Sequence, residues 1–149
     1  MAQLGATASA IMTFTEKLED YSATLYQEFG ERYPESRDLF FSFAEESKKN
    51  KTLIVRTYQE TITDALEACF CFRGMNLAKY SLNASPSKHA KYVDALKSAL
   101  QLEEKATEFY CEVARLSENL LATIPRVFKK TAERRKIRQQ VLRSLAEKI

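Results

Sequence analysis

A shortage of turn-forming residues and the helical spacing of the apolar ones predict an all-α chain, built as a four-helix bundle. The sequence has 149 residues but only three glycines and three prolines, which leaves room for a few long helices. Within the expected helices, apolar side chains recur every three or four positions, as on the buried face of a helix. The length and a hydrophobic fraction of 45% suit one domain over residues 1–149 with a sizeable core.

The first two helices are expected to form a hairpin. The first covers about residues 7–32, with Gly30 near its end and Pro34 just after it. Ser36 is a suitable N-cap for the second helix, which is expected from residue 37 to about residue 72. This helix is unusually long, and residues 61–64 form a weak helical patch where it could bend or break.

The last two helices are expected to form a second hairpin. A loop with a short turn covers residues 75–87, and the third helix follows over about 88–121. Pro125 falls in the first turn of the fourth helix, where it removes no needed donor, and this helix continues to about residue 148. Tight links within each hairpin and a long crossover between them are typical of a ferritin-like bundle, in contrast to an up-down bundle with short loops throughout.

An internal repeat supports the prediction of two related hairpins. Glu19 precedes a Leu-Tyr pair at residues 25–26, and Glu103 stands at the same distance before a Phe-Tyr pair at residues 109–110. The triplets 43–45 and 131–133 match at nearly the same offset. A weak duplication of this kind is expected when one helical hairpin is related to another.

The fourth predicted helix raises the question on which the function depends. Its apolar stripe would contain Phe128, Arg135, Arg138 and Leu142, so two arginines stand where apolar residues are expected. A buried guanidinium requires an acidic partner, because an unpaired charge in a protein core is very costly. Either the stripe is interrupted and the arginines face water, or they are buried and paired.

Four stretches, one in each predicted helix, carry a family resemblance: ExxxxxLY in the first, LFFSFAEESKKNK in the second, LEEKATEFY in the third and FKKTAERRKIR in the fourth. On these stretches the chain resembles the rubrerythrin-like branch of the ferritin-like superfamily, over essentially its whole length. The resemblance implies a Glu on helices one and three and a Glu-x-x-His on helices two and four. Such a set holds two irons, because hard carboxylate oxygens offset the metal charge and residues i and i+3 share one helical face.

Carried over position by position, the resemblance predicts that the di-iron site has been lost. The positions that correspond to the family ligands are Glu19, Ser47, Asn50, Glu103, Arg135 and Arg138. The two single glutamates are kept, but Ser and Asn stand at the ExxH positions of the second helix and two arginines at those of the fourth. A guanidinium stays protonated and cannot ligate iron. We therefore expect no metal, no cofactor and no catalytic residue, and expect each arginine to pair with the glutamates while the Ser and Asn complete the hydrogen bonds.

Three hypotheses for the function follow. The favoured one is a non-catalytic rubrerythrin/ferritin-like protein that acts as a homodimer or with another protein partner. The first alternative is a di-iron carboxylate oxidoreductase or peroxidase of the rubrerythrin type, against which the missing histidines argue. The second is a basic helical nucleic-acid-binding protein, against which the small net charge of +3 argues. The basic residues of the fourth helix are instead expected to form a solvated outer face plus two core pairs.

The remaining features bear on location and partners. The apolar run 65–75 is expected in the core, with a homodimer contact as the alternative. Cys69, Cys71 and Cys111 are expected to be buried free thiols, because no four-ligand zinc set accompanies them. The only histidine, His89, is expected at the surface or as a cap. Without a signal-peptide pattern or an apolar run of about 18 residues, we expect a cytoplasmic protein with no membrane contact.

Overall fold

Helices dominate the computed structural model, which describes residues 6–61, 71–72, 74–81, 89–118 and 123–148. Within these ranges the chain forms four long α-helices, two 3₁₀ turns and one two-residue antiparallel bridge. The helices are α1 (Ala8–Arg32), α2 (Arg37–Thr61), α4 (Tyr92–Leu116) and α5 (Thr123–Glu147). The 3₁₀ turns are η1 (Pro34–Ser36) and η2 (Leu77–Tyr80), and the strands are β1 (Ala6–Thr7) and β2 (Cys71–Phe72). The all-α, four-helix prediction is confirmed.

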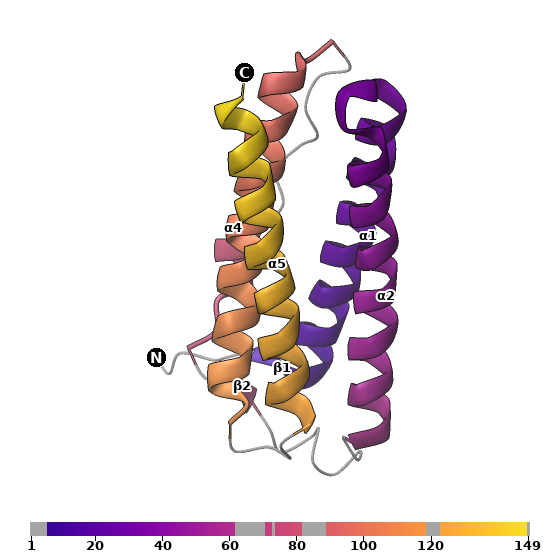
Figure 1. Cartoon of the computed structure of the whole chain (residues 1–149). Coiled ribbons are helices and arrows are strands. Elements are labelled where there is room, and N and C mark those ends of the chain that lie inside the picture. Colours follow the sequence, from indigo (N-terminus) through magenta and orange to yellow (C-terminus); the bar gives the residue numbers. More distant parts are fainter. Residues whose placement is uncertain (1–5, 62–70, 73, 82–88, 119–122, 149) are drawn as a thin grey trace.

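The helices pack as two hairpins, α1 with α2 and α4 with α5, and α2 also lies against α5 (Figure 1). In Figure 1 α1 and α5 run upward while α2 and α4 run downward. Because α2 and α4 run in the same direction, the chain between them must return from one end of the bundle to the other. The expected arrangement of two antiparallel hairpins is therefore present, and it lets all four helices face one shared centre.

The structure corrects the expected end of the second helix. Thr7 caps α1 by accepting a hydrogen bond from the amide of Ala10 at 3.0 Å, close to the expected start. Residues 71–72, where the second helix is expected to end, are however not helical but extended. They pair as β2 with β1, Ala6 opposite Phe72 and Thr7 opposite Cys71. Pairing with the extended segment before α1 satisfies backbone groups that a longer α2 would have bonded internally.

The turn between α1 and α2 also differs in detail from the expectation. Ser36 ends η1, and its hydroxyl forms a 2.5 Å hydrogen bond with the hydroxyl of Tyr92 at the start of α4. It therefore ties the two hairpins together at this end of the bundle. Gly30 lies inside α1, where a Cβ would come within 2.3 Å of the Phe41 ring. Glycine at this position permits the close approach of α1 and α2 just before the turn.

The expected positions of the apolar run, the cysteines and the histidine can be compared with their burial. In the apolar run 65–75, Phe72 and Met75 are buried as expected, while residues 65–70 lie outside the described residues. Cys111 is free but exposed, so its expected burial is wrong; it lies on the outer face of α4. Cys69 and the side chain of Cys71 lie outside the described part of the chain. His89 is exposed just before α4, as expected. Within the described residues no helix has the length and apolar character needed to cross a membrane.

Candidate functional site: a buried Glu–Arg network

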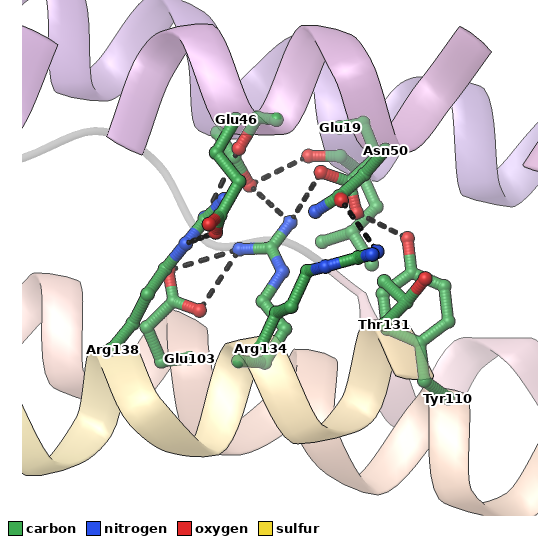
Figure 2. A network of polar contacts seen from close by, with 12 residues as sticks. Glu19, Glu46, Asn50, Glu103, Tyr110, Thr131, Arg134 and Arg138 are labelled. Atoms are coloured by element: carbon green, nitrogen blue, oxygen red, sulfur yellow. Dashed lines mark hydrogen bonds and ion pairs between the residues drawn. The ribbon is translucent and has the colours of Figure 1, made fainter. Parts of the chain in front are cut away.

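The two arginines of the α5 stripe are buried. Arg135 and Arg138 are 0% and 1% exposed, in a row with Phe128, Thr131 and Leu142, which are buried as well. Their spacing of three residues places both side chains on the face of α5 that points into the bundle. Figure 2 shows the resulting network, with Glu19 and Glu46 reaching in from one hairpin and Glu103 and Arg138 from the other.

Arg135 connects the carboxylates of the two hairpins. Its Nη2 donates to Oε1 of Glu19 on α1 at 2.7 Å and to the hydroxyl of Ser22 at 3.1 Å. Its Nη1 donates to both carboxylate oxygens of Glu103 on α4, at 3.0 and 2.9 Å. Neither glutamate has any exposed side-chain surface. The guanidinium thus lies between two buried carboxylates, as the sequence predicts.

Arg138 completes the network and extends it toward the surface. Its Nη1 donates to the hydroxyl of Ser47 at 3.0 Å and approaches Oε2 of Glu103 at 3.4 Å. Its Nε donates at 2.8 Å to Glu46, a carboxylate of α2 that is 39% exposed. The guanidinium carbon lies 5.2 Å from the ring centroid of Phe43 and 5.7 Å from that of Tyr26, distances at which a cation is attracted to an aromatic face.

Two tyrosines cross between the hairpins and bond to the same glutamates. Tyr26 of α1 donates to Oε2 of Glu103 at 2.5 Å, and Tyr110 of α4 donates to Oε2 of Glu19. Each tyrosine follows the glutamate of its own helix by seven residues, yet it binds the glutamate of the other helix. The repeat seen in the sequence therefore corresponds to a reciprocal pair of contacts across the bundle.

Asn50 lies at the edge of the network and behaves differently from the expectation. It is 2% exposed, and its Oδ1 accepts a hydrogen bond from Nη1 of Arg134 at 3.5 Å (Figure 2). The expected contact with one of the two core arginines is not among the hydrogen bonds of the described residues. Arg134 is half-buried at the rim of α5, so Asn50 connects the network with the surface between α2 and α5.

Arg135 and the two central tyrosines each keep one protonation state at neutral pH. Burial lowers the pKa of Arg135, but attraction to Glu103 and Glu19 outweighs it, so the pKa lies above the usual value for arginine. Burial, followed by the nearby carboxylates, raises the pKa of Tyr26 and of Tyr110 well above 10.0. The arginine therefore stays charged and both phenols stay protonated at neutral pH. The deepest part of the network contains two negative and two positive side chains.

The residues present do not fit a di-iron centre. The carboxylates of Glu19 and Glu103 are both engaged by guanidinium groups and phenols, and two fixed cations stand at the positions where the resemblance implies Glu and His. The part of the chain that the structure describes contains no group of three or more His, Cys, Asp or Glu side chains able to hold a metal ion. Two irons would place further positive charge beside Arg135 and Arg138, with no imidazole to bind them.

Comparison with protein-family models, curated protein sequences and solved structures found no significant match for this chain.

Sequence reasoning missed two members of the site, Glu46 and Arg134. The two residues correspond under the same internal offset that relates Ser47 to Arg135 and Asn50 to Arg138. This offset could have indicated both residues, since it places Glu46 and Arg134 directly before the predicted ligand positions on α2 and α5. Tyr26 and Tyr110 belong to the internal repeat in the sequence, but their hydrogen bonds to the opposite glutamates depend on the distance between the hairpins.

Proposed function

We propose that this protein is a non-catalytic member of the rubrerythrin-like, ferritin-like bundles, in which a buried Glu–Arg network stands in place of a di-iron centre. The observation that carries the proposal is the Arg135 guanidinium, fully buried between Glu19 and Glu103. Nη1 of Arg135 contacts both oxygens of Glu103 and Nη2 contacts Glu19, so these charged hydrogen bonds fix the positions of the three groups and occupy lone pairs that a metal would need. On this proposal the centre is a structural element, and the protein acts through its surface, as a homodimer or with another protein.

The direction of the helices supports the ferritin-like part of the proposal. Ferritin-like bundles contain two antiparallel hairpins joined by one long crossover, whereas up-down bundles have short loops throughout. The parallel course of α2 and α4 in Figure 1 is compatible with the first arrangement. The reciprocal contacts of Tyr26 and Tyr110 also relate the two hairpins to each other, as an internal duplication would.

The structure adds no support for binding of nucleic acid through α5. Arg135 and Arg138 are buried in the bundle and cannot contact phosphates. Of the remaining basic residues on this helix, Arg143 lies 3.1 Å from Glu104 of α4. Because Arg135 and Arg138 are buried, fewer positive side chains of α5 remain on the surface. Binding of a polyanion depends on clustered, accessible Lys and Arg side chains.

Metal analysis tests the proposal directly. Iron, manganese and zinc would be measured in native protein purified without chelator and in a variant that rebuilds the ligand set, with Ser47→Glu, Asn50→His, Arg135→Glu and Arg138→His. We expect less than stoichiometric metal in the native protein and uptake in the variant, because the variant supplies carboxylates and imidazoles and removes both cations.

A surface variant, Arg143→Glu, serves as the control, since it makes the same Arg-to-Glu change as at position 135 but outside the network, and it should bind no metal. Native protein that holds about one or more metal ions per chain would contradict the proposal. The di-iron oxidoreductase hypothesis would then be favoured.

A further inference from the structure

The segment between the two hairpins has two parts, and each is attached to a different hairpin. β2 pairs with β1, which leads directly into α1, so this part stays with the first hairpin. η2 lies on α4, where the hydroxyl of Tyr80 donates to Glu112 at 2.5 Å and Nζ of Lys105 donates to the carbonyl of Ser81 at 3.1 Å. The first unit therefore contains β1, α1, α2 and β2, and the second contains η2, α4 and α5.

A tight turn joins the two units. The amide of Met75 donates to the carbonyl of Phe72 at 3.2 Å, which closes the turn. Gly74 lies inside it with a φ of 79°, a conformation that residues with a Cβ rarely adopt. In Figure 1 β2, which leads into the turn, lies at the end of the bundle where α1 begins. Opening the turn leaves the pairing of β2 with β1 and the contacts of η2 with α4 in place.

The surfaces that the two units present to each other have opposite charges. Among the network residues, the first unit contributes two acids and no base, whereas the second contributes one acid and three bases: Glu19 and Glu46 against Glu103, Arg134, Arg135 and Arg138. Two copies of the first unit would place acids against acids, and two copies of the second would place arginines against arginines. Each unit therefore fits the other kind, from its own chain or from a second copy.

We propose that two copies of this chain exchange hairpins, so that α1 and α2 of one copy complete the bundle with α4 and α5 of the other. Each Arg135 then lies between Glu103 of its own chain and Glu19 of the second copy. The exchanged dimer keeps the contacts between the units and differs from the closed chain at the turn, which is extended. A short turn that needs an unusual backbone conformation favours exchange, because opening it removes the constraint.

The site at the centre is then built from two chains. This inference rests on the proposed function for the homodimer, and it names the second copy as the partner and the network as the contact. The closed chain and the exchanged dimer are related by mass action, so the dimer gains weight as the protein concentration rises.

The turn provides the first test, with the dimer measured by sedimentation equilibrium over a wide range of protein concentration. Gly74→Val should lower the dissociation constant of the dimer about tenfold or more, because a β-branched residue opposes the positive φ of the closed turn. A Cβ at this position meets no atom within 4 Å, so the substitution acts through the backbone and not through a clash. A short Gly-Ser insertion after Gly74 should favour the monomer, because a longer loop closes without this turn.

Two results of this series overturn the proposal. One is a native chain that stays monomeric throughout, together with a monomeric Gly74→Val variant. The other is a dimer whose dissociation constant responds to neither change at the turn, because such a dimer is held by a surface contact.

Reversed charges test the contact itself. Arg135→Glu in one chain and Glu19→Arg in another each leave mismatched charges at the centre. When the two variants are unfolded and refolded together, exchange yields one bundle with the native Glu19–Arg135 pair and one with the reversed pair. We expect a heterodimer by native mass spectrometry and a melting temperature above that of either variant alone. The control is the mixture of Arg143→Glu with Glu104→Arg, whose melting temperature mixing should not change, because both positions lie in the second unit.

A mixture that contains no heterodimer and melts as the sum of its components overturns the proposal. A heterodimer without a rise in melting temperature also overturns it, because exchange would restore the pair. Neither measurement involves metal, so a failure here is distinct from a failure of the proposed function, which metal content tests.

Discussion

Arg135 holds together groups that would otherwise be buried charges without partners. Glu19 comes from α1 and Glu103 from α4, and neither has water contact in the bundle. Transfer of these ions from water to the core costs several kcal/mol each, and their attraction offsets much of that cost. The net stabilisation by the complete network is therefore expected to be small. The loss of a single member is a different case, because the other members stay buried.

Arg135→Ala should lower the free energy of unfolding by about 3–5 kcal/mol, since it leaves two carboxylates uncompensated. Chemical denaturation of the native and variant proteins at neutral pH measures the difference. Arg143→Ala is the matched control, because it removes an arginine from the half-exposed pair with Glu104. Exposed pairs contribute at most about 1 kcal/mol. Equal losses in the two variants would contradict the role assigned to Arg135.

The packing of the helices themselves rests on apolar surfaces. α1 and α4 contribute Leu18, Phe29, Leu96 and Phe109, which are almost fully buried. The network lies among these side chains and sets how the hairpins align, because its hydrogen bonds have defined directions. The short Ser47 and Asn50 on α2 leave room for the long arginines of α5, so the two helices have complementary side-chain volumes at the centre.

If apolar packing stabilises the bundle, Arg135, its two glutamates and their two tyrosines should be replaceable together, while Arg138 keeps its ion pair with Glu46. The variant combines five substitutions: Glu19→Leu, Glu103→Leu, Arg135→Met, Tyr26→Phe and Tyr110→Phe. We expect it to fold with a free energy of unfolding equal to the native value or higher by about 1–4 kcal/mol, because no buried charge or phenol among these residues is left unpaired. Circular dichroism and chemical denaturation report both properties. Loss of helical structure would show that the network is required for folding.

Three buried phenols lie beside carboxylates, whereas the phenol of Tyr33 donates to the carbonyl of Ala90. Tyr26 and Tyr110 contact the central glutamates, and Tyr80 of η2 donates to Glu112 of α4 at 2.5 Å. Burial, followed by the neighbouring carboxylates, raises the pKa of all three phenols. In the unfolded chain a tyrosine ionises near pH 10.0, so the unfolded state releases these protons first. The stability of the fold is thereby linked to alkaline pH.

A phenol whose pKa is raised in the folded state contributes stability that is complete below its unfolded pKa and is lost as the pH rises through the folded pKa. We therefore expect the free energy of unfolding to fall above about pH 10. Denaturation curves at a series of alkaline pH values measure this slope. Tyr26→Phe with Tyr110→Phe should give a shallower slope, although the loss of two hydrogen bonds lowers stability at neutral pH. An unchanged slope in the double variant would contradict the assignment.

Much of the fold could be predicted from the sequence, because helix content and helix limits depend on local chemistry. The scarcity of Gly and Pro, the capping Thr7 and Pro125 in a first turn are local signals, and α1 and α5 begin and end within about a residue of the prediction. Two limits differ from the prediction: α4 covers Tyr92–Leu116 where about 88–121 is expected, and the expected end of the second helix is replaced by the extended pair at Cys71–Phe72. Its partner, β1, lies far away in the sequence, so no local pattern could indicate that contact.

The sequence by itself also determined which residue types meet at the centre. Two arginines at helical spacing cannot be buried without acidic partners, and the family resemblance named Glu19 and Glu103 as those partners. Only the tertiary structure decided how they pair. It places Arg135 between both glutamates, sends Arg138 to Glu46, crosses the two tyrosines and leaves Asn50 beside Arg134. These choices depend on the distances and angles between helices, which arise from the packing of the whole core and not from any one segment.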